Sequence, residues 1–527
     1  MSRIGGIIGG GVSLCAVWAL SESPLSSRKT VQSVESTSKA AYCAGKDDGP
    51  STVSAALVTA YKEWLRSRGT DIKLVELHGG IGTDSITARL SSAGRNICLP
   101  RWFGFSRISN IFKRDPVLLS FPVLHAISKD SSAIPKDINF SFEDESRLII
   151  HLLIEKLRGT SSYLSPWLAI LPERFSLPMC WTDDELEWLK GTSLHKGTML
   201  KRKELQRVWE ELEPICHQII NIERLPQKPS FEDFLWATAA FQSMSVPLPQ
   251  SGTATGFSMQ LLPGTEILQP SPNGDCIWSL DKSGESLCAV CSRRRLRSKQ
   301  GNMPLTVSVG DDLSMEQLIF QYGVIEMDPQ REVLMINCPI PPPDQWDDTF
   351  KKRLALLLEN GLGPQLFLSQ KHYDSISQIS QSRKHLNMDG SERQRWFEKI
   401  VPKDVLKTVE IFVMDADDLE DIGSECDASD PQLKSSGMRM AVMTTIVRLL
   451  ELKLYTLQHK EDGTGTLESD EILWEACNDK GDDNDTHHIV ALRHRMAQKS
   501  LTRRYLKIYS DYLQEEMRYL HQLQNDL

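Results

Sequence analysis

The sequence predicts an α+β body followed by an all-helical domain, within a chain of 527 residues. Two changes of pattern support this fold class. Residues 247–340 are rich in Pro, Gly and Ser and carry short β-type runs such as CIWSL and SLCAVC. The run PIPPPDQWD at 339–347 has the composition of a linker, and helical periodicity dominates after it. Three consecutive prolines continue neither a helix nor a strand ladder, so we expect a linker over 339–346.

The first 50 residues are expected to form a targeting or anchoring tail that is largely disordered. Residues 4–20 carry no charge, follow Arg3, and reach only the lower edge of a membrane span. A Ser-rich stretch with few acids follows at 21–46, as in transit peptides. We expect an intracellular protein, with plastid, cytosol and nucleus all left open. Any membrane contact is expected through residues 4–20 alone.

The ordered part is expected to begin with a helix at 53–69, where apolar residues repeat at helical spacing before Gly69. Short strands are expected at 72–82 and 94–100. A helical region follows at about 145–240, in which Thr182 and Glu185 form a capping box. The predicted helices beyond the linker cover residues 347–361, 395–423, 432–459, 467–478 and 487–526. His487 and His488 are interpreted as the start of the last one.

Composition excludes one broad class of partner. The net charge is −10, whereas a protein that coats nucleic acid needs an excess of Lys and Arg, so no nucleic-acid partner is expected. The basic run at 292–299 is either a solvated loop or a nuclear-localisation patch. The 11 cysteines have no framework spacing, which predicts free buried thiols and no metal site.

A glycine-rich turn, HGGIGTD, occupies residues 78–84. It lacks the third glycine of a dinucleotide-binding fingerprint, because position 85 is Ser. Gly80 and Gly82 nevertheless allow the backbone to approach a ligand closely. No serine-hydrolase elbow, phosphate-binding loop or zinc-protease motif is present, so motif spacing alone indicates no enzyme class.

The stretch SVGDDLSMEQLIFQYGVIE, residues 308–326, predicts a short helix that carries Tyr322 to Gly323. Two interpretations are open at this point. Tyr322 is either a buried core residue at a helix-to-strand connection or a residue that lines a reaction channel.

Four segments in order resemble one protein family. They are YLSPWLAILPERFSLPMCWTDDELEWLKGTSL (163–194), FEDFLWATAAFQSMSVPLP (231–249), LLPGTEILQPSPNGDCIWSLD (261–281) and the stretch at 308–326. Together they are similar to SET-domain protein lysine methyltransferases of the rubisco large-subunit methyltransferase branch. AQKSLTRRYL at 497–506 resembles the substrate-binding C-terminal domain of that branch. The resemblance implies a SET-type β-rich core over 51–338 with an inserted helical region, and a helical domain over 347–527.

The resemblance also implies a reaction. A neutral lysine amine of a protein substrate attacks the sulfonium methyl of S-adenosyl-L-methionine, with alignment and desolvation lowering the barrier. Tyr322 matches the catalytic tyrosine of the family. Gly80, Gly82, Gln269 and Tyr322 fall on positions that bind the methyl donor, and no metal is implied. We expect a monomer that contacts its protein substrate.

Several positions depart from the family pattern. The Asn-His pair of the family falls on Gln269 and Pro270, and its donor-binding Arg falls on Met244. A core Tyr falls on Val309, and an Asn falls on Ser314. Proline offers neither a side-chain hydrogen bond nor a backbone N–H, so donor binding is expected to be weak. The alternative is a SET-fold protein that has lost catalysis and acts as a protein-binding module.

Overall fold

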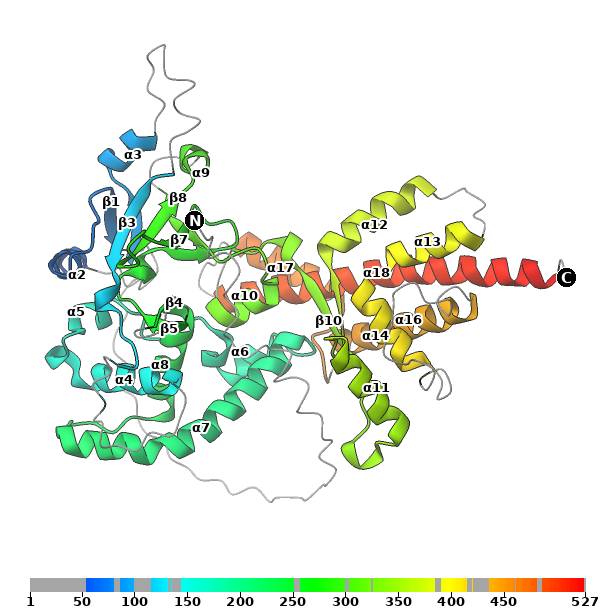
Figure 1. Ribbon diagram of the computed structural model, residues 1–527, viewed down its shortest axis with the longest axis horizontal. Coiled ribbons are helices and arrows are strands. Elements are labelled where there is room, and N and C mark those ends of the chain that lie inside the picture. The colour runs from blue at the N-terminus through cyan, green and yellow to red at the C-terminus, as the bar shows by residue number, and fades with distance from the viewer. Residues whose placement is uncertain are drawn as a thin grey trace, which may run out of the picture.

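The computed structural model describes residues 54–79, 86–98, 115–130, 134, 144–250, 256–298, 303–323, 326–383, 390–414, 419, 436–459, 461–480 and 486–525. The predicted tail at 1–50, together with Gly80 and Gly82, therefore lies outside the described residues. The rest forms two lobes (Figure 1). One lobe carries the main sheet and the inserted helices, and the other carries most of the C-terminal helices.

A five-stranded mixed sheet forms the centre of the first lobe, in the order β3-β8-β7-β9-β6. Strand β9 runs parallel to both β6 and β7, and the other pairs in this sheet are antiparallel. Two-stranded sheets β1-β2 and β4-β5 flank it. The strands of this lobe are β1 (Val75–Gly79), β2 (Ile86–Leu90), β3 (Val117–Pro122), β4 (Ser245–Pro249), β5 (Phe257–Leu261), β6 (Gln269–Ser271), β7 (Cys276–Leu280), β8 (Ser286–Cys291) and β9 (Thr306–Ser308).

Helices of the inserted region cover one end of this lobe, below the sheet in Figure 1. The predicted capping box is confirmed: Thr182 Oγ1 accepts from the Glu185 backbone N–H, and the Glu185 carboxylate accepts from the Thr182 N–H. The helices of the first lobe are α2 (Ala55–Ser67), α3 (Ser92–Cys98), α4 (Asp144–Arg158), α5 (Ser165–Leu168), α6 (Asp183–Glu187), α7 (Ser193–Glu223), α8 (Phe231–Met244), α9 (Arg293–Ser298) and α10 (Met315–Tyr322).

The prediction of a strand at 94–100 is wrong, because Ser92–Cys98 forms helix α3. Ser91 Oγ accepts a hydrogen bond from the Gly94 N–H at 3.1 Å, in the manner of a helix N-cap. A Cβ at Gly94 would lie 2.2 Å from the Leu74 carbonyl oxygen, so the first turn packs directly on the chain before β1. This cap and contact outweigh the apolar run that predicted a strand.

The second lobe is not entirely helical, which corrects the prediction for the chain after 347. Strands β10 (Val333–Asn337) and β11 (Gln365–Ser369) form an antiparallel pair. In β11, Leu366 and Leu368 are buried while Phe367 is 44% exposed, so one strand face enters the core. The helices of this lobe are α11 (Asp348–Glu359), α12 (Gln370–Arg383), α13 (Gly390–Ile400), α14 (Lys403–Val413), α16 (Ser436–Gln458), α17 (Leu467–Lys480) and α18 (Thr486–Asn525).

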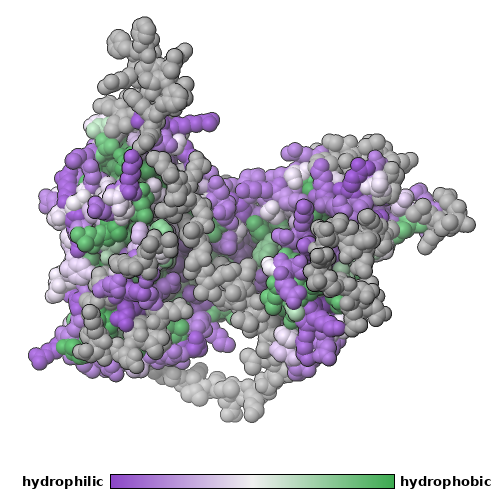
Figure 2. Space-filling view, viewed as in Figure 1, coloured by the Kyte–Doolittle hydropathy of each residue, from purple (hydrophilic) through white to green (hydrophobic). Residues whose placement is uncertain are grey.

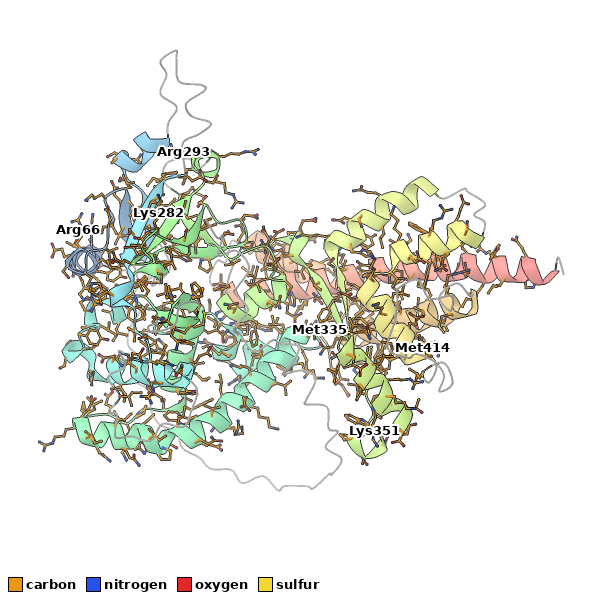
Figure 3. All side chains as sticks on the ribbon, viewed as in Figure 1. Arg66, Lys282, Arg293, Met335, Lys351 and Met414 are labelled. Carbon is orange, nitrogen blue, oxygen red and sulfur yellow. A yellow bond between two sulfur atoms is a disulfide. The ribbon has the colours of Figure 1, made fainter. Side chains whose placement is uncertain are left out.

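The expected linker at 339–346 lies between β10 and β11. Leu334 and Ile336 of β10 belong to the same apolar core as Leu366 and Leu368 of β11. We therefore propose that the division between the lobes lies before Val333. In Figure 3, Met335 lies near the junction of the two lobes, and Met414 lies within the second one.

A separate apolar cluster joins the lobes at α10. Met315, Leu318 and Ile319 of α10 pack with residues of the inserted region and with Val490 and Ala491 of α18. The predicted helix start at His487 and His488 also contacts the inserted region. Their imidazole rings lie against Trp181 and Trp188, with ring centroids 4.8 and 4.7 Å apart. Helix α10 is thus held between the two lobes.

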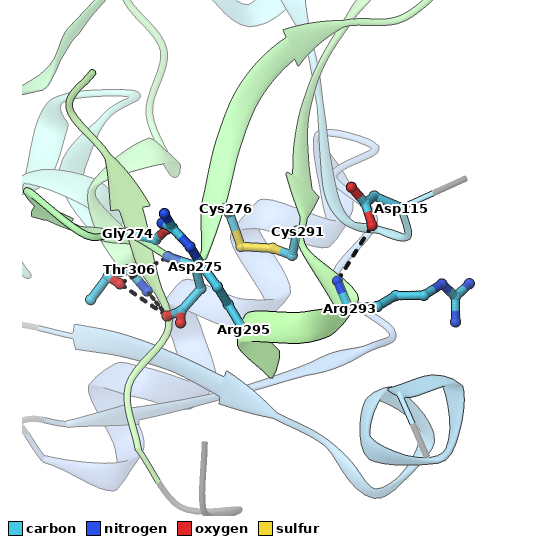
Figure 4. The surroundings of a disulfide bond; sticks show 8 residues. All are labelled: Asp115, Gly274, Asp275, Cys276, Cys291, Arg293, Arg295 and Thr306. Atoms are coloured by element: carbon cyan, nitrogen blue, oxygen red, sulfur yellow. Dashed lines mark hydrogen bonds between the residues drawn. A yellow bond between two sulfur atoms is a disulfide. The ribbon is translucent and has the colours of Figure 1, made fainter. Parts of the chain in front are cut away.

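The expectation of free thiols is wrong for one pair of cysteines. Cys276 and Cys291 face each other across β7 and β8 and form a disulfide (Figure 4). Both residues are fully buried. The other described cysteines with resolved side chains are free: Cys180, Cys216, Cys288, Cys338 and Cys477.

The visible face of the molecule is largely hydrophilic, with small separate apolar patches (Figure 2). No helix within the described ranges is long and apolar enough to cross a membrane. The basic run at 292–299, which was interpreted as either a solvated loop or a nuclear-localisation or nucleic-acid patch, contains the short helix α9. Arg293 of this helix lies far from the junction of the lobes (Figure 3).

Candidate functional site

Helix α10 is defined at both ends by its own sequence. Ser314 caps its start: Ser314 Oγ accepts from the Gln317 N–H at 3.2 Å, and Gln317 Oε1 accepts from the Ser314 N–H at 2.8 Å. At the other end, Gly323 has a left-handed backbone with φ of 76° and ends the helix directly after Tyr322. The position of Tyr322 is therefore fixed by a short capped helix.

Gly323 also places this end of the helix against the inserted region. A Cβ at Gly323 would lie 2.3 Å from the Ser176 carbonyl oxygen, so only glycine fits without movement of the backbone. The Trp181 indole Nε1 donates to the same carbonyl oxygen at 2.9 Å. The loop at 176–181 thus forms a wall beside Tyr322.

The Tyr322 side chain is partly buried against the cluster that joins the lobes. Its burial raises the pKa of the phenol to about 12, and no charged neighbour contributes to the shift. Among the described residues, the hydroxyl has no hydrogen-bond partner. A buried tyrosine normally pairs its hydroxyl, so this group is available to a ligand.

Gln269 lies at the start of β6, opposite Thr306 of β9. It is partly buried, and its amide has no hydrogen-bond partner among the described residues. The next residue, Pro270, occupies the centre of the short strand. Gln269 therefore offers a free amide, while its neighbour offers only apolar surface.

The structure brings β6 and the segment after Tyr322 together. Ser271, at the end of β6, donates from Oγ to Glu326 Oε2 at 3.0 Å. This pair could not be predicted from sequence, because 55 residues separate the two partners and no spacing motif marks them. The predicted residues Gln269 and Tyr322 thus lie on segments that are tied to each other, while Gly80 and Gly82 lie outside the described residues.

Helix α8 also contacts helix α10, through a hydrogen bond to its last turn. The Gln242 side-chain amide donates to the Phe320 carbonyl oxygen at 2.9 Å. Carbonyls in the last turn of a helix have no partner within the helix, so Gln242 satisfies one of them. Met244, two residues later, ends α8 and is partly buried. A position expected for an anion-binding Arg therefore carries an uncharged side chain in the structure as well.

Comparison with solved structures places this arrangement in a known fold. The SET domain of the methyltransferase LSMT, solved with lysine and AdoHcy, superposes with a TM-score of 0.61, 88% coverage of this chain and 92% of that chain. The sequence identity is 16%. The chain has the SET fold. A structure of Rubisco LSMT bound to AdoMet gives a TM-score of 0.59 at the same 16% identity.

Curated relatives of this SET-fold protein are distant in sequence. An Arabidopsis thaliana chloroplastic fructose-bisphosphate aldolase lysine N-methyltransferase is 23% identical over 41% of this chain and 43% of its own length. The Schizosaccharomyces pombe ribosomal lysine N-methyltransferase set10 is 22% identical over 51% and 47%. The Danio rerio actin-histidine N-methyltransferase is 26% identical over 22% and 19%. Each alignment thus spans less than half of the relative, and no protein-family profile matches the chain.

These comparisons confirm the predicted fold class and the similarity to the rubisco methyltransferase branch. The SET-type core, the helical insertion and the helical C-terminal region are all present. The roles of Gly80, Gly82, Gln269 and Tyr322 stay predictions. Within the described ranges, no three His, Cys, Asp or Glu side chains are grouped to hold a metal ion.

Proposed function

We propose that this SET-fold protein is an S-adenosyl-L-methionine-dependent protein-lysine N-methyltransferase. The observation that carries the proposal is the Tyr322 hydroxyl, which has no hydrogen-bond partner among the described residues and lies at the end of a helix terminated by Gly323. The similar solved structures support it, since they hold lysine with AdoHcy in one case and AdoMet in another.

The residues present fit the donor in part. S-adenosylmethionine, when bound, supplies an electrophilic methyl group on a sulfonium. Gln269 has a free amide that can hold a polar part of the donor, and Gly80 and Gly82 are proposed to let the backbone approach it. Met244 and Pro270 supply neither charge nor a side-chain hydrogen bond, so the carboxylate of the donor is expected to keep more of its water.

Tyr322 acts on the acceptor side of the site. Its raised pKa keeps the phenol neutral throughout the physiological range, so the hydroxyl accepts or donates a hydrogen bond without adding negative charge. It orients a neutral amine toward the methyl group, and the apolar wall around it excludes water from the attacking nitrogen. Such orientation and desolvation account for about 7–11 kcal/mol in favourable intramolecular models.

The second candidate is a catalytically inactive SET-fold protein that binds other proteins. Met244 and Pro270 favour it, because each removes a donor contact that the family pattern provides. The Danio rerio relative is named an actin-histidine N-methyltransferase, so the experiment must also distinguish lysine from histidine as the acceptor of the methyl group.

The deciding experiment titrates the full-length protein with S-adenosylmethionine and with S-adenosylhomocysteine in a calorimeter. Methyl transfer is then followed by incubating the protein with tritiated donor and a protein extract, and mass spectrometry identifies the modified residue. Donor binding with label on lysine supports the proposal. Label on histidine changes the acceptor, and a folded protein that binds no donor supports the binding module.

A further inference from the structure

We infer that Arg331 is a positioning residue. It holds the start of helix α10 next to the end of strand β6, and so it sets the positions of Tyr322 and Gln269 relative to each other. This inference rests on the proposed function for its activity readout, although its structural readout does not. Arg331 follows strand β6 and helix α10 in the chain, and only Glu332 separates it from β10. The side chain is buried, with 7% of the residue exposed.

The guanidinium joins two backbone segments that are distant in sequence. Arg331 Nη2 donates to the Pro272 carbonyl oxygen at 2.9 Å, one residue beyond β6. Arg331 Nη1 donates to the Gly310 carbonyl oxygen at 2.8 Å and to that of Leu313 at 3.4 Å. Leu313 directly precedes the Ser314 cap of α10. One planar group therefore connects the end of β6 with the start of α10.

Two carboxylates complete the surroundings of this guanidinium. Asp311 Oδ1 lies 3.3 Å from Nη2, and Asp328 Oδ2 lies 3.4 Å from Nε. The Asp311 side chain is 95% exposed, so water screens its charge and its contribution is small. Asp328 is mostly buried and orients the guanidinium from its own chain segment. The hydrogen bonds to the three carbonyl oxygens are therefore the main contacts by which Arg331 links the two segments.

The effect reaches the proposed site through the length of α10. Helix α10 has only 8 residues, and its backbone hydrogen bonds link each residue to the one four positions earlier, so a shift at the start of the helix moves Tyr322 with it. The Ser271–Glu326 hydrogen bond ties the segment after Tyr322 to the same strand from the other side. With Arg331 at one end and this pair at the other, α10 is attached to β6 twice.

Lysine cannot replace this arginine. An ammonium is a point charge on a flexible stem, whereas the planar guanidinium presents five donors in a fixed fork. Arg331→Lys keeps the charge and most of the apolar stem, but it cannot reach the Pro272 and Gly310 oxygens together. A substitution that keeps the charge therefore isolates the positioning geometry.

The chain offers a matched control in the second lobe. Arg439 of α16 is also buried, at 3% exposed, and donates to Glu516 Oε1 at 2.6 and 3.1 Å. Arg439→Lys makes the same chemical change far from α10. It reports what the loss of a buried guanidinium does to overall stability.

The experiment measures hydrogen–deuterium exchange in the full-length wild type, Arg331→Lys and Arg439→Lys. Arg331→Lys is expected to raise amide exchange in peptides covering 308–326 and 265–275 at least tenfold, while Arg439→Lys leaves both peptides unchanged. Equal exchange of these peptides in both variants, or no change in Arg331→Lys, overturns the inference. This readout needs no donor and no substrate, so it remains decisive if the proposed function fails.

The activity readout follows if the wild type transfers methyl groups. At a temperature where all three proteins are folded, Arg331→Lys is expected to lower kcat about tenfold, and Arg439→Lys to leave kcat unchanged. A similar loss of kcat in both variants means that Arg331 contributes only to general stability. If Arg331→Lys does not fold, Asp328→Asn removes the charge beside Arg331 Nε and keeps an oxygen that can accept from the Gln330 N–H. This variant is expected to give the same pattern of exchange at smaller amplitude. Unchanged exchange in Asp328→Asn then overturns the inference.

Discussion

The end of α10 and the strand β6 form two sides of the proposed site, and their neighbours constrain them differently. At the end of α10, the Ser176 backbone leaves room only for a glycine at position 323, and within the described part of the chain the Tyr322 hydroxyl has no hydrogen-bond partner. At β6, the Gln269 amide likewise has no partner among the described residues, and the Pro270 side chain adds no polar group. The acceptor side is thus built to tight steric limits, while the donor side has few specific contacts.

The contacts around Tyr322 stabilise the fold, whereas contacts around Gln269 would contribute only to donor binding. Tyr322 is positioned by the Ser314 cap of α10 and by the close approach of Gly323 to Ser176. The Gln242 amide adds a hydrogen bond to the Phe320 carbonyl oxygen. These contacts stabilise the fold whether or not a donor is bound. Contacts to a bound donor contribute nothing to the fold in its absence, so they can be lost without loss of structure. An intact structure around Tyr322 is therefore weaker support for methyltransferase activity than a measured affinity for the methyl donor.

The largest effect is expected for Gly323→Ala, which tests the steric limit on the acceptor side. The new Cβ would meet the Ser176 carbonyl oxygen at 2.3 Å in a backbone with φ of 76°. Overpacking and left-handed strain together are expected to lower the free energy of unfolding by about 4 kcal/mol. Urea denaturation measures this loss.

Gly284→Ala is the matched control, because Gly284 has the same φ of 76° and no atom within 4 Å of a Cβ. It is expected to lose only the strain, about 1 kcal/mol. Equal losses at the two glycines would show that Ser176 moves freely, and the acceptor side would then be no tighter than a surface turn.

The next effect concerns Tyr322→Phe, which removes only the hydroxyl. We expect kcat to fall about a hundredfold, as when one positioned hydrogen-bonding group is lost, with little change in stability. Tyr505→Phe removes a hydroxyl that donates to the Ser369 carbonyl oxygen at 2.7 Å in the second lobe. It is expected to cost about 1 kcal/mol of stability with no change in kcat. A lower melting temperature with full activity in Tyr322→Phe would make Tyr322 a core residue.

A smaller effect is expected on the donor side from Met244→Arg. One charged hydrogen bond is worth about 1.5 kcal/mol, which corresponds to about a tenfold lower Kd for S-adenosylmethionine. Calorimetry measures the Kd of this variant and of Met199→Arg, a substitution at a 45% exposed position on α7. If both variants tighten binding equally, added charge alone is responsible, and Met244 does not lie where the donor carboxylate binds.

The smallest effect is expected in the alkaline pH profile. The amine acceptor must lose a proton, so kcat should rise with pH up to the pKa of the amine, about 10.4. The pKa of Tyr322 is about 12, so its phenol remains neutral over this range and no falling limb should appear below about pH 11. Because burial favours the neutral phenol, its contribution to stability is complete below pH 10 and is lost as pH rises to about 12. A decline in kcat near pH 10 in the folded protein would contradict this assignment.

Periodic and local features of the chain could be predicted from sequence. The helical region at about 145–240, the capping box at Thr182 and the strands β7 and β8 each depend on neighbours within a few residues, and each was found in the expected place. Helix α10 was predicted for the same reason. Such elements are specified by side chains that repeat at 2.0 or 3.6 residues.

Features that depend on distant partners could not be predicted. Strand β11 has only five residues and is defined by its pairing with β10, about 30 positions earlier. The Ser271–Glu326 pair and the three carbonyl oxygens around Arg331 follow from the crossing of segments, which no spacing in the sequence records. For the candidate site, Tyr322 and Gln269 were proposed from the sequence and stay predictions, and the residues that hold their segments together could not be predicted.

The Cys276–Cys291 disulfide reports the redox conditions in which the chain folds. Both residues are fully buried, and Figure 4 shows them beside the hydrogen bond from the Thr306 hydroxyl to Asp275. Reagents in solution reach such thiols only before the sheet closes, so their oxidation state is set during folding and then retained. Disulfides form in oxidising compartments and are rare where glutathione keeps thiols reduced. Alkylating the protein at the moment of denaturation, straight from its native source, therefore reveals the compartment in which the chain folded.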